Sequence, residues 1–321
     1  MMSNIAVDIL EGSIPKDILN ILLQDHTTQK NIFWGTADYE HFGEGYGEYD
    51  EITCEKICDN LKIIPRVKKS RYEQLSRVRE KAEVFTPSWV CNAQNNLVDN
   101  IWFGREGVFN VEGDKLWITT ENYISFPSSQ GKSWQDYVRD VRLEITCGEA
   151  PYLVSRYDAI TGEFIKVNNR IGLLDRKLRV VSENTLTKGD WWQWAKIAIQ
   201  CIYGFEWQGD SLLLARENVL YTFIDYYSTK FGEKPPIEYI REVAKIISWN
   251  LWQMDGLKGV VPNSCSVVQT VSQELFGETS TQEQICEGCA KGNIHRHNGI
   301  YCKIKDWTTG GVVKYVSMIE K

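Results

Sequence analysis

Apolar residues recur at helical spacing in several parts of the chain and predict a series of amphipathic helices. These helices are predicted over residues 15–24, 88–99, 133–140, 191–200, 210–227 and 237–247. Glycines that separate short aromatic and β-branched runs predict a hairpin and loop over residues 102–135. A second hairpin, with a Thr-Thr-Gly-Gly turn, is predicted over residues 299–318.

Two short apolar runs predict neighbouring strands of an open α/β sheet. Residues 142–157 indicate a strand, a tight turn at Gly148 and the first turn of a helix. Cys201-Ile-Tyr-Gly-Phe-Glu206 indicates a strand that ends in a carboxylate and precedes a long helix. Open α/β sheets hold nucleosides in this way, with helix amides on one side and a carboxylate for the ribose hydroxyls on the other. The pattern predicts a nucleoside site between Gly148 and Glu206.

These segments resemble motifs of the AdoMet-dependent N6-adenine DNA methyltransferases, the modification enzymes of restriction systems. Leu143-Glu-Ile-Thr-Cys-Gly-Glu-Ala-Pro-Tyr-Leu153 resembles the family's glycine-rich loop, with Ala150 in place of its second glycine. Glu83-Val-Phe-Thr-Pro87 resembles the Thr-Pro motif that lies against the methionine end of AdoMet, and Glu206 matches the acid that binds the ribose. The three motifs stand in the family's order, and the resemblance covers roughly residues 60–260.

The resemblance implies an AdoMet site and assigns residues to it. By position, Asp255 matches the acid that accepts a hydrogen bond from the adenine amino group of AdoMet, and a turn aspartate before Gly256 is the alternative. The implied cofactor-binding residues are Phe85, Thr86, Pro87, Glu144, Thr146, Gly148, Glu206 and Asp255.

The expected fold is α/β, a Rossmann-like AdoMet methyltransferase sheet with an N-terminal helical region and a small C-terminal appendage. The appendage combines a β-hairpin with a cluster like a zinc knuckle. The expected boundaries are an N-terminal extension over residues 1–60, an AdoMet-binding domain over 61–262, and an insertion with the terminal hairpin over 263–321. At 321 residues the chain is long enough for a large domain core.

A motif that the family needs for catalysis is missing. Adenine N6 is a poor nucleophile, and the family's Asn/Asp-Pro-Pro-aromatic motif holds the flipped base by acceptors and stacking. The only Pro-Pro pair here is in Lys234-Pro-Pro-Ile237, which has neither the acceptor nor the ring. We therefore expect a sheet that lacks the strand beside the one ending at Glu144, which leaves an unpaired apolar edge. A second subunit or a downstream region is then expected to supply the catalytic motif.

The charge pattern bears on binding to double-stranded DNA, the expected partner. The formal net charge of −7 does not favour phosphate contacts, but basic residues dominate the stretch from Lys62 to Lys81. A solvated helix face with internal ion pairs is the alternative for this stretch. The candidate DNA-binding residues are Arg66, Lys68, Lys69 and Arg71.

Cysteine usage suggests a metal site near the C-terminus. The nine cysteines, without a secretion signal, argue against a disulfide framework, and no run of apolar residues is long enough to span a membrane. The cytoplasm is therefore the expected compartment. Thiolates and imidazoles are the ligands that zinc prefers, and a loop with free thiols is the alternative. The candidate zinc ligands are Cys286, Cys289, His295, His297 and Cys302.

Three functions remain to be separated. The first is the AdoMet-binding part of a DNA adenine methyltransferase. The second is a non-catalytic nucleic-acid-binding or regulatory module that has this fold and a zinc knuckle. The third is a different AdoMet or nucleotide enzyme on the same sheet, since one fold serves many activities.

Overall fold

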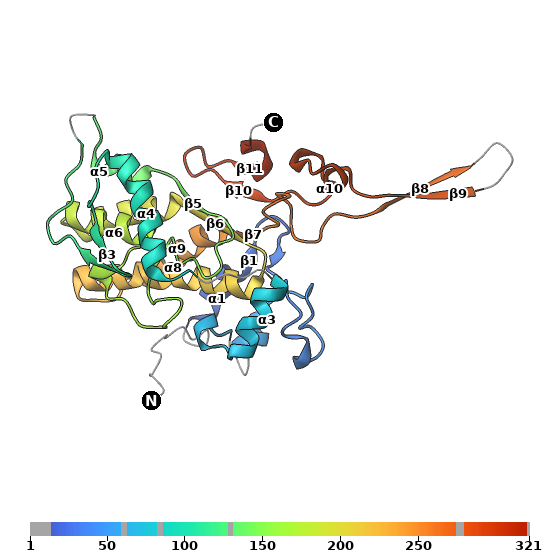
Figure 1. The fold of residues 1–321 in the computed structure, drawn as a ribbon, viewed down its shortest axis with the longest axis horizontal. Coiled ribbons are helices and arrows are strands. Elements are labelled where there is room, and N and C mark those ends of the chain that lie inside the picture. The colour runs from blue at the N-terminus through green and yellow to red at the C-terminus, as the bar shows by residue number, and fades with distance from the viewer. Residues whose placement is uncertain (1–13, 59–62, 82–85, 128–130, 274–278, 320–321) are drawn as a thin grey trace.

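A three-stranded parallel sheet lies at the centre of the computed structural model, which describes residues 14–58, 63–81, 86–127, 131–273 and 279–319 (Figure 1). Its strands are β5 (Arg142–Glu144), β6 (Ile202–Glu206) and β7 (Leu251–Gln253), in that spatial order. Glu144 pairs with Gly204, and Glu206 with Gln253. The carboxyl ends of all three strands therefore lie at one edge, and a mixed α/β fold is confirmed.

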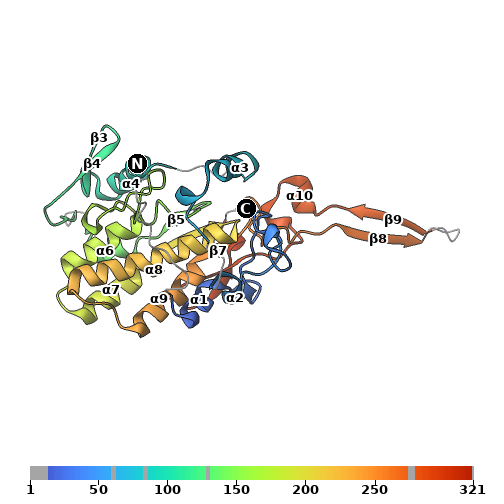
Figure 2. The same cartoon turned by 90° about the horizontal axis from the view of Figure 1, so that it is seen from below.

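Helices connect the strands and pack together beside the sheet. The β5 to β6 connection carries α6 (Leu173–Asn184) and α7 (Lys188–Gln200), and the β6 to β7 connection carries α8 (Gly209–Phe231) and α9 (Ile237–Asn250). Helix α1 (Lys16–Leu23) packs against α9 and α8, and Figure 2 shows these helices side by side. The predicted helices at 15–24, 191–200, 210–227 and 237–247 are confirmed, as are α4 (Ser88–Phe103) and α5 (Trp134–Arg139).

Smaller elements surround this centre. The predicted hairpins contain β3 with β4 and β10 with β11, both antiparallel. A further hairpin, β8 with β9, projects from the body as an arm (Figure 1). The remaining elements are β1 (Gln24–Asp25), β2 (Lys30–Asn31), η2 (Glu40–Phe42), α2 (Cys54–Cys58), η3 (Arg66–Lys68), α3 (Arg71–Lys81), β3 (Asn110–Gly113), β4 (Leu116–Thr119), η5 (Val167–Asn169), β8 (Val268–Gln273), β9 (Thr279–Gln284), α10 (Glu287–Lys291), η6 (Ile294–Arg296), β10 (Lys303–Lys305), β11 (Val312–Lys314) and η7 (Tyr315–Met318).

One local prediction is wrong. The segment after β5, residues 145–157, forms turns rather than the start of a helix. Two further elements were not predicted from the sequence, namely α6 within residues 161–190 and the β8–β9 hairpin within residues 263–285.

A buried arginine ties the N-terminal helix to the sheet. The Arg216 side chain of α8 is fully buried and donates hydrogen bonds to the carbonyls of Gln24 at 3.0 Å, Ser248 at 3.3 Å and Leu251 at 2.6 Å. These carbonyls belong to the ends of α1 and α9 and to β7. A single guanidinium, with five N–H donors, therefore fixes three chain segments at one point.

The outer edge of the sheet is apolar and exposed. Among the described residues no strand pairs with the free side of β5. Val141, Leu143 and Ile145, along this strand, are exposed by 61%, 41% and 64%. Such an edge can pair with another strand.

Candidate functional site

A cavity of about 1010 Å³ lies at the carboxyl ends of β5 and β6. Its walls include the turns after β5, residues 206–208 at the end of β6, Thr86 before α4, and Arg79 of α3. In open α/β sheets, ligands bind in the crevice beyond the carboxyl ends of the strands. The cavity therefore occupies the position where this class of sheet binds its ligands.

The turn after β5 holds its backbone in an unusual conformation. Thr146, Gly148 and Ala150 have positive φ angles of 48°, 52° and 64°. A side chain in the left-handed region costs roughly 1–2 kcal/mol, so Thr146 and Ala150 are strained. Residues held in this way cluster at functional sites, where surrounding contacts enforce them. Here Cys147 N donates to the Phe205 carbonyl at 2.9 Å, which fixes the turn against β6.

The Glu144 side chain binds the backbone of the turn that follows β5. Its carboxylate is buried and accepts hydrogen bonds from the backbone amides of Tyr152 at 3.3 Å and Leu153 at 3.0 Å. Burial, together with a smaller effect of the charge of Glu206, raises the pKa of Glu144 to about 8 against the opposing effect of these amides. A carboxyl group that titrates near neutral pH in a cavity wall is able to respond to the charge of a ligand.

Glu206 links the ends of the two strands. Its Oε2 accepts from the amide of Gly148 at 2.8 Å, and its Oε1 accepts from the amide of Trp207 at 2.9 Å. The acid at the end of β6 and the glycine turn after β5 are therefore in direct contact. This contact holds the carboxylate at the cavity wall.

The cavity wall carries more acidic than basic side chains. Its acids are Glu48, Glu144, Glu149 and Glu206, and its basic residues are Arg79 and Arg156. In a hollow with restricted solvent the excess of carboxylates favours a cationic ligand over an anionic one.

The structure brings together most of the predicted cofactor residues. Those that line the cavity are Thr86, Glu144, Thr146, Gly148 and Glu206. Pro87 is not among the lining residues and instead caps the N-terminus of α4, and Phe85 lies outside the described residues.

The prediction that Asp255 binds the cofactor is corrected, because this residue does not line the cavity. Its carboxylate accepts from the amide of Leu257 at 3.1 Å and forms an ion pair with Lys258 at 3.0 Å. The end of β7 instead presents Gln253, whose Nε2 donates to the Trp207 carbonyl at 2.7 Å. The alternative interpretation of Asp255, as a turn residue before Gly256, is the one that fits.

The basic stretch is partly internal, which contradicts the DNA-contact prediction for Arg66 and Lys69. The Arg66 amide donates to Glu149 at 2.7 Å, and its buried guanidinium donates to the Gln74 carbonyl at 3.0 Å. Lys69 Nζ lies 3.1 Å from Asp210 Oδ2, and the Lys69 side chain is only 7% exposed. Lys68 and Arg71 are exposed, as phosphate contacts require.

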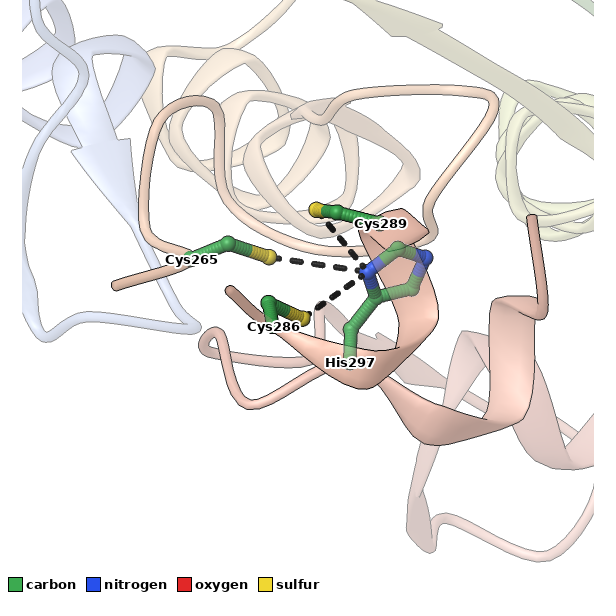
Figure 3. Close-up of side chains that lie close together, drawn as sticks. All are labelled: Cys265, Cys286, Cys289 and His297. Atoms are coloured by element: carbon green, nitrogen blue, oxygen red, sulfur yellow. Dashed lines mark hydrogen bonds between the residues drawn. The ribbon is translucent and has the colours of Figure 1, made fainter. Parts of the chain in front are cut away.

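Four residues near the base of the β8–β9 arm form a cluster that can hold a metal ion such as zinc. Cys265, Cys286, Cys289 and His297 place their ligand atoms within 4.8 Å of one another, and Figure 3 shows the three sulfurs around one imidazole nitrogen. Hereafter these four residues are called the Cys/His cluster.

Two of the five predicted ligands are outside the cluster. Cys302 is buried elsewhere, and its Sγ donates to the Gln253 carbonyl at 3.4 Å. His295, in η6, is likewise not a member of the group. Cys265 was missed because it stands far from Cys286 in the sequence. Recognition of the intervening hairpin would have identified it, since a hairpin brings its two flanks together.

Comparison of the chain with protein-family models, with curated proteins and with solved structures finds no significant match. Within the described ranges, no helix combines the length and the apolar character needed to cross a membrane.

Proposed function

We propose that the cavity binds S-adenosyl-L-methionine and that the chain is the cofactor-binding part of an adenine-N6 DNA methyltransferase. One observation carries the proposal. Thr86, Gly148 and Glu206 belong to three separate motifs, and all three residues line one cavity at the carboxyl ends of β5 and β6. This is the arrangement that the resemblance implies for the methionine end, the glycine loop and the ribose acid.

The order of the strands supports the proposal. In doubly wound sheets the first strand carries the glycine turn, and the acid for the ribose stands at the end of its neighbour. The parallel order β5-β6-β7 places Gly148 after the first strand and Glu206 at the end of the second. The 2.8 Å contact between the Gly148 amide and Glu206 puts the two groups at one point, where a nucleoside would meet both.

The charge of the cavity supports a sulfonium ligand. AdoMet carries a sulfonium and an ammonium group beside one carboxylate, so its methionine end suits a wall rich in glutamates. Nucleoside triphosphates and dinucleotides carry several negative charges, which the Glu206 carboxylate would repel. Binding of AdoMet in preference to ATP is therefore part of the proposal.

The target adenine requires groups from another segment or another chain. Lys234-Pro-Pro-Ile237 leads into α9 and is not part of the cavity wall. The exposed apolar edge at Val141, Leu143 and Ile145 offers a place for an additional strand beside the cavity. We propose that the catalytic acceptors reach the cavity from this side and that double-stranded DNA is the substrate.

Calorimetric titration with AdoMet tests the proposal. The wild-type chain should bind AdoMet, and Glu206→Ala should weaken binding about 10- to 150-fold, as expected for loss of hydrogen bonds to a charged group. Glu233→Ala is the matched control, because Glu233 is exposed and pairs only with Lys188 in the contacts described. ATP should not compete.

Equal affinity of the wild-type and Glu206→Ala chains, or binding of ATP in place of AdoMet, would contradict the proposal. The Cys/His cluster favours a second candidate of a different class, a non-catalytic nucleic-acid-binding or regulatory module. Zinc binding together with a complete lack of AdoMet binding would support that candidate.

A further inference from the structure

The geometry of the Cys/His cluster is that of a metal site rather than a hydrogen-bonded group. His297 Nδ1 lies 3.6 Å from the sulfurs of Cys265, Cys286 and Cys289 alike. An imidazole nitrogen has either one N–H or one lone pair, so it can satisfy at most one of the three thiols. The three equal distances to one nitrogen therefore indicate that the four atoms surround a position that a metal ion can occupy.

The distances also agree with zinc coordination. In a tetrahedral site, zinc lies about 2.3 Å from sulfur and about 2.0–2.1 Å from nitrogen, which separates sulfur from nitrogen by about 3.6 Å. The observed separations of 3.6 Å match this value. All four positions of the tetrahedron come from the protein, as in structural sites, whereas catalytic zinc keeps one position open.

The backbone around the cluster is shaped to allow this convergence. A Cβ at Gly288 would lie 2.6 Å from His297 Nδ1, and a Cβ at Gly299 would lie 3.0 Å from Cys265 Sγ. Only glycine fits at 288 without moving the imidazole. The Asn298 amide lies 3.3 Å from Cys286 Sγ and donates to it, which is the outer-shell contact that orients a thiolate ligand.

The segment that carries the ligands has little other support. Between residues 263 and 300, and among residues whose burial is described, the only buried apolar or charged side chains are Cys286 and His297. Val267, Ile285 and Ile300 are exposed by 53%, 63% and 52%. A segment without an apolar core of its own requires another source of stability, and a bound metal supplies it in many small units.

The four ligands come from the chain segments before and after the β8–β9 hairpin. Cys265 precedes β8 and Cys286 follows β9, while Cys289 lies in α10 and His297 follows η6. Figure 1 shows α10 at the root of the projecting hairpin. We propose that Cys265, Cys286, Cys289 and His297 hold a structural zinc ion that closes the base of the β8–β9 arm.

Metal analysis of the full chain, purified without chelators, tests this assignment. The wild-type chain should contain about one zinc ion per molecule. His297→Ala and Cys289→Ser should each lower zinc affinity more than about 100-fold, beyond the 10- to 100-fold effect of losing an outer-shell partner. The matched controls are His295→Ala and Cys302→Ser, which remove the same residue types from positions outside the cluster and should retain zinc.

Replacement with cobalt provides a readout that does not depend on zinc loss during purification. Cobalt added to the metal-free chain should give the visible bands of a tetrahedral site and thiolate charge-transfer absorption. Cys265→Ser should lower the charge-transfer absorption, because one of three thiolates is lost. This result would favour the ligand set that includes Cys265 over the ligand set predicted from the sequence, which does not include it.

Limited proteolysis tests the structural role. Removal of the metal should expose the chain between residues 266 and 299 to cleavage, and addition of zinc should restore protection. A wild-type chain that takes up neither zinc nor cobalt, or controls that lose metal as the ligand variants do, would overturn the proposal. None of these measurements uses AdoMet, so their failure is distinct from failure of the proposed function.

Discussion

Asp210, at the start of α8, is the centre of a buried charge network that includes part of the basic stretch. Its Oδ2 accepts from Tyr39 at 2.9 Å and from Lys69 at 3.1 Å, and it also accepts from Arg77. The side chains of Asp210, Arg77 and Lys69 are exposed by 0%, 3% and 7%. We predict that Lys69→Met destabilises the fold, whereas Arg71→Met, which removes an exposed positive charge from the same basic stretch, does not.

The expected magnitude follows from what remains after the substitution. A hydrogen bond to a charged group contributes about 1.5–3 kcal/mol. Breaking a buried pair completely costs about 3–5 kcal/mol, but Asp210 keeps Arg77 and Tyr39. Lys69→Met should therefore lower the free energy of unfolding by about 1.5–3 kcal/mol. Arg71→Met should change it by less than about 0.5 kcal/mol, as is usual for surface positions.

Urea unfolding at neutral pH measures both variants, and the pH dependence identifies the cause. Although burial opposes ionisation, the charges of Lys69 and Arg77 hold the pKa of Asp210 well below its ordinary value of 3.8. Stability from such a depressed acid is present above pH 3.8 and is lost as the pH falls towards the folded pKa. The difference between wild type and Lys69→Met should therefore shrink in acid. Equal, small effects of the two substitutions at neutral pH would refute the network.

Two further predictions concern the cavity and the packing of α8. Because burial raises the pKa of Glu144 to about 8, Glu144 is mostly protonated in the free chain at neutral pH. A cationic ligand favours the carboxylate, so AdoMet affinity should rise about tenfold from about pH 7 to about pH 9 by calorimetry. The Glu144→Gln variant is the control, because any pH dependence of its AdoMet affinity comes from titration of the ligand itself. If the ratio of wild-type to Glu144→Gln affinity were the same at both pH values, this linkage would be excluded. Gly209→Ala places a Cβ 2.0 Å from the Phe33 carbonyl and should lower stability by at least about 2 kcal/mol. Gly189→Ala, in an open position of α7, should be neutral or stabilising in the same denaturation assay, and equal losses would contradict the packing argument.

Periodicity predicted the helices whose buried faces are apolar. In α1 the buried residues Ile18, Leu19, Leu22 and Leu23 recur at helical spacing, so the sequence alone indicates both the helix and its packing face. The same reasoning identified α8 and α9. The strands β5 and β6 were also predicted, because each is a short apolar run that ends in an acid.

Helix α6 could not be found in this way because part of its buried face is charged. Asp175, Arg176 and Lys177 are almost completely buried. Arg176 pairs with Asp99 at 2.6 Å, and Lys177 donates to the Val138 carbonyl at 2.9 Å. A hydropathy pattern assigns such residues to the surface. Only the partners on other elements make their burial favourable, and the sequence does not show which residues those are.

The candidate sites were predicted only in part, because some of their residues depend on partners that are distant in the sequence. Gly148 and Glu206 were placed together because residues at the carboxyl ends of parallel strands share one edge, whereas Thr86 was placed with them only by the resemblance. The metal ligands depend on an arm that brings Cys265 beside Cys286, and the basic stretch depends on Asp210 as a buried partner. Both are long-range pairings that local sequence does not specify.

The position of Asp255 shows how the C-terminal segment affects the cavity wall. After β7 the chain crosses the ring of Phe205 at Gly256, where a Cβ would lie 2.4 Å from the ring. Asp255 then forms an isolated β-bridge with Val260, and Val260 forms another with Tyr301. The backbone of this acid is therefore connected to the C-terminal segment that carries the Cys/His cluster. The Gln253 side chain occupies the place at the strand end, bound to the Phe33 and Trp207 carbonyls at 2.9 Å and 2.7 Å. Because Trp207 lines the cavity, an amide rather than an acid on the third strand supports the cavity wall.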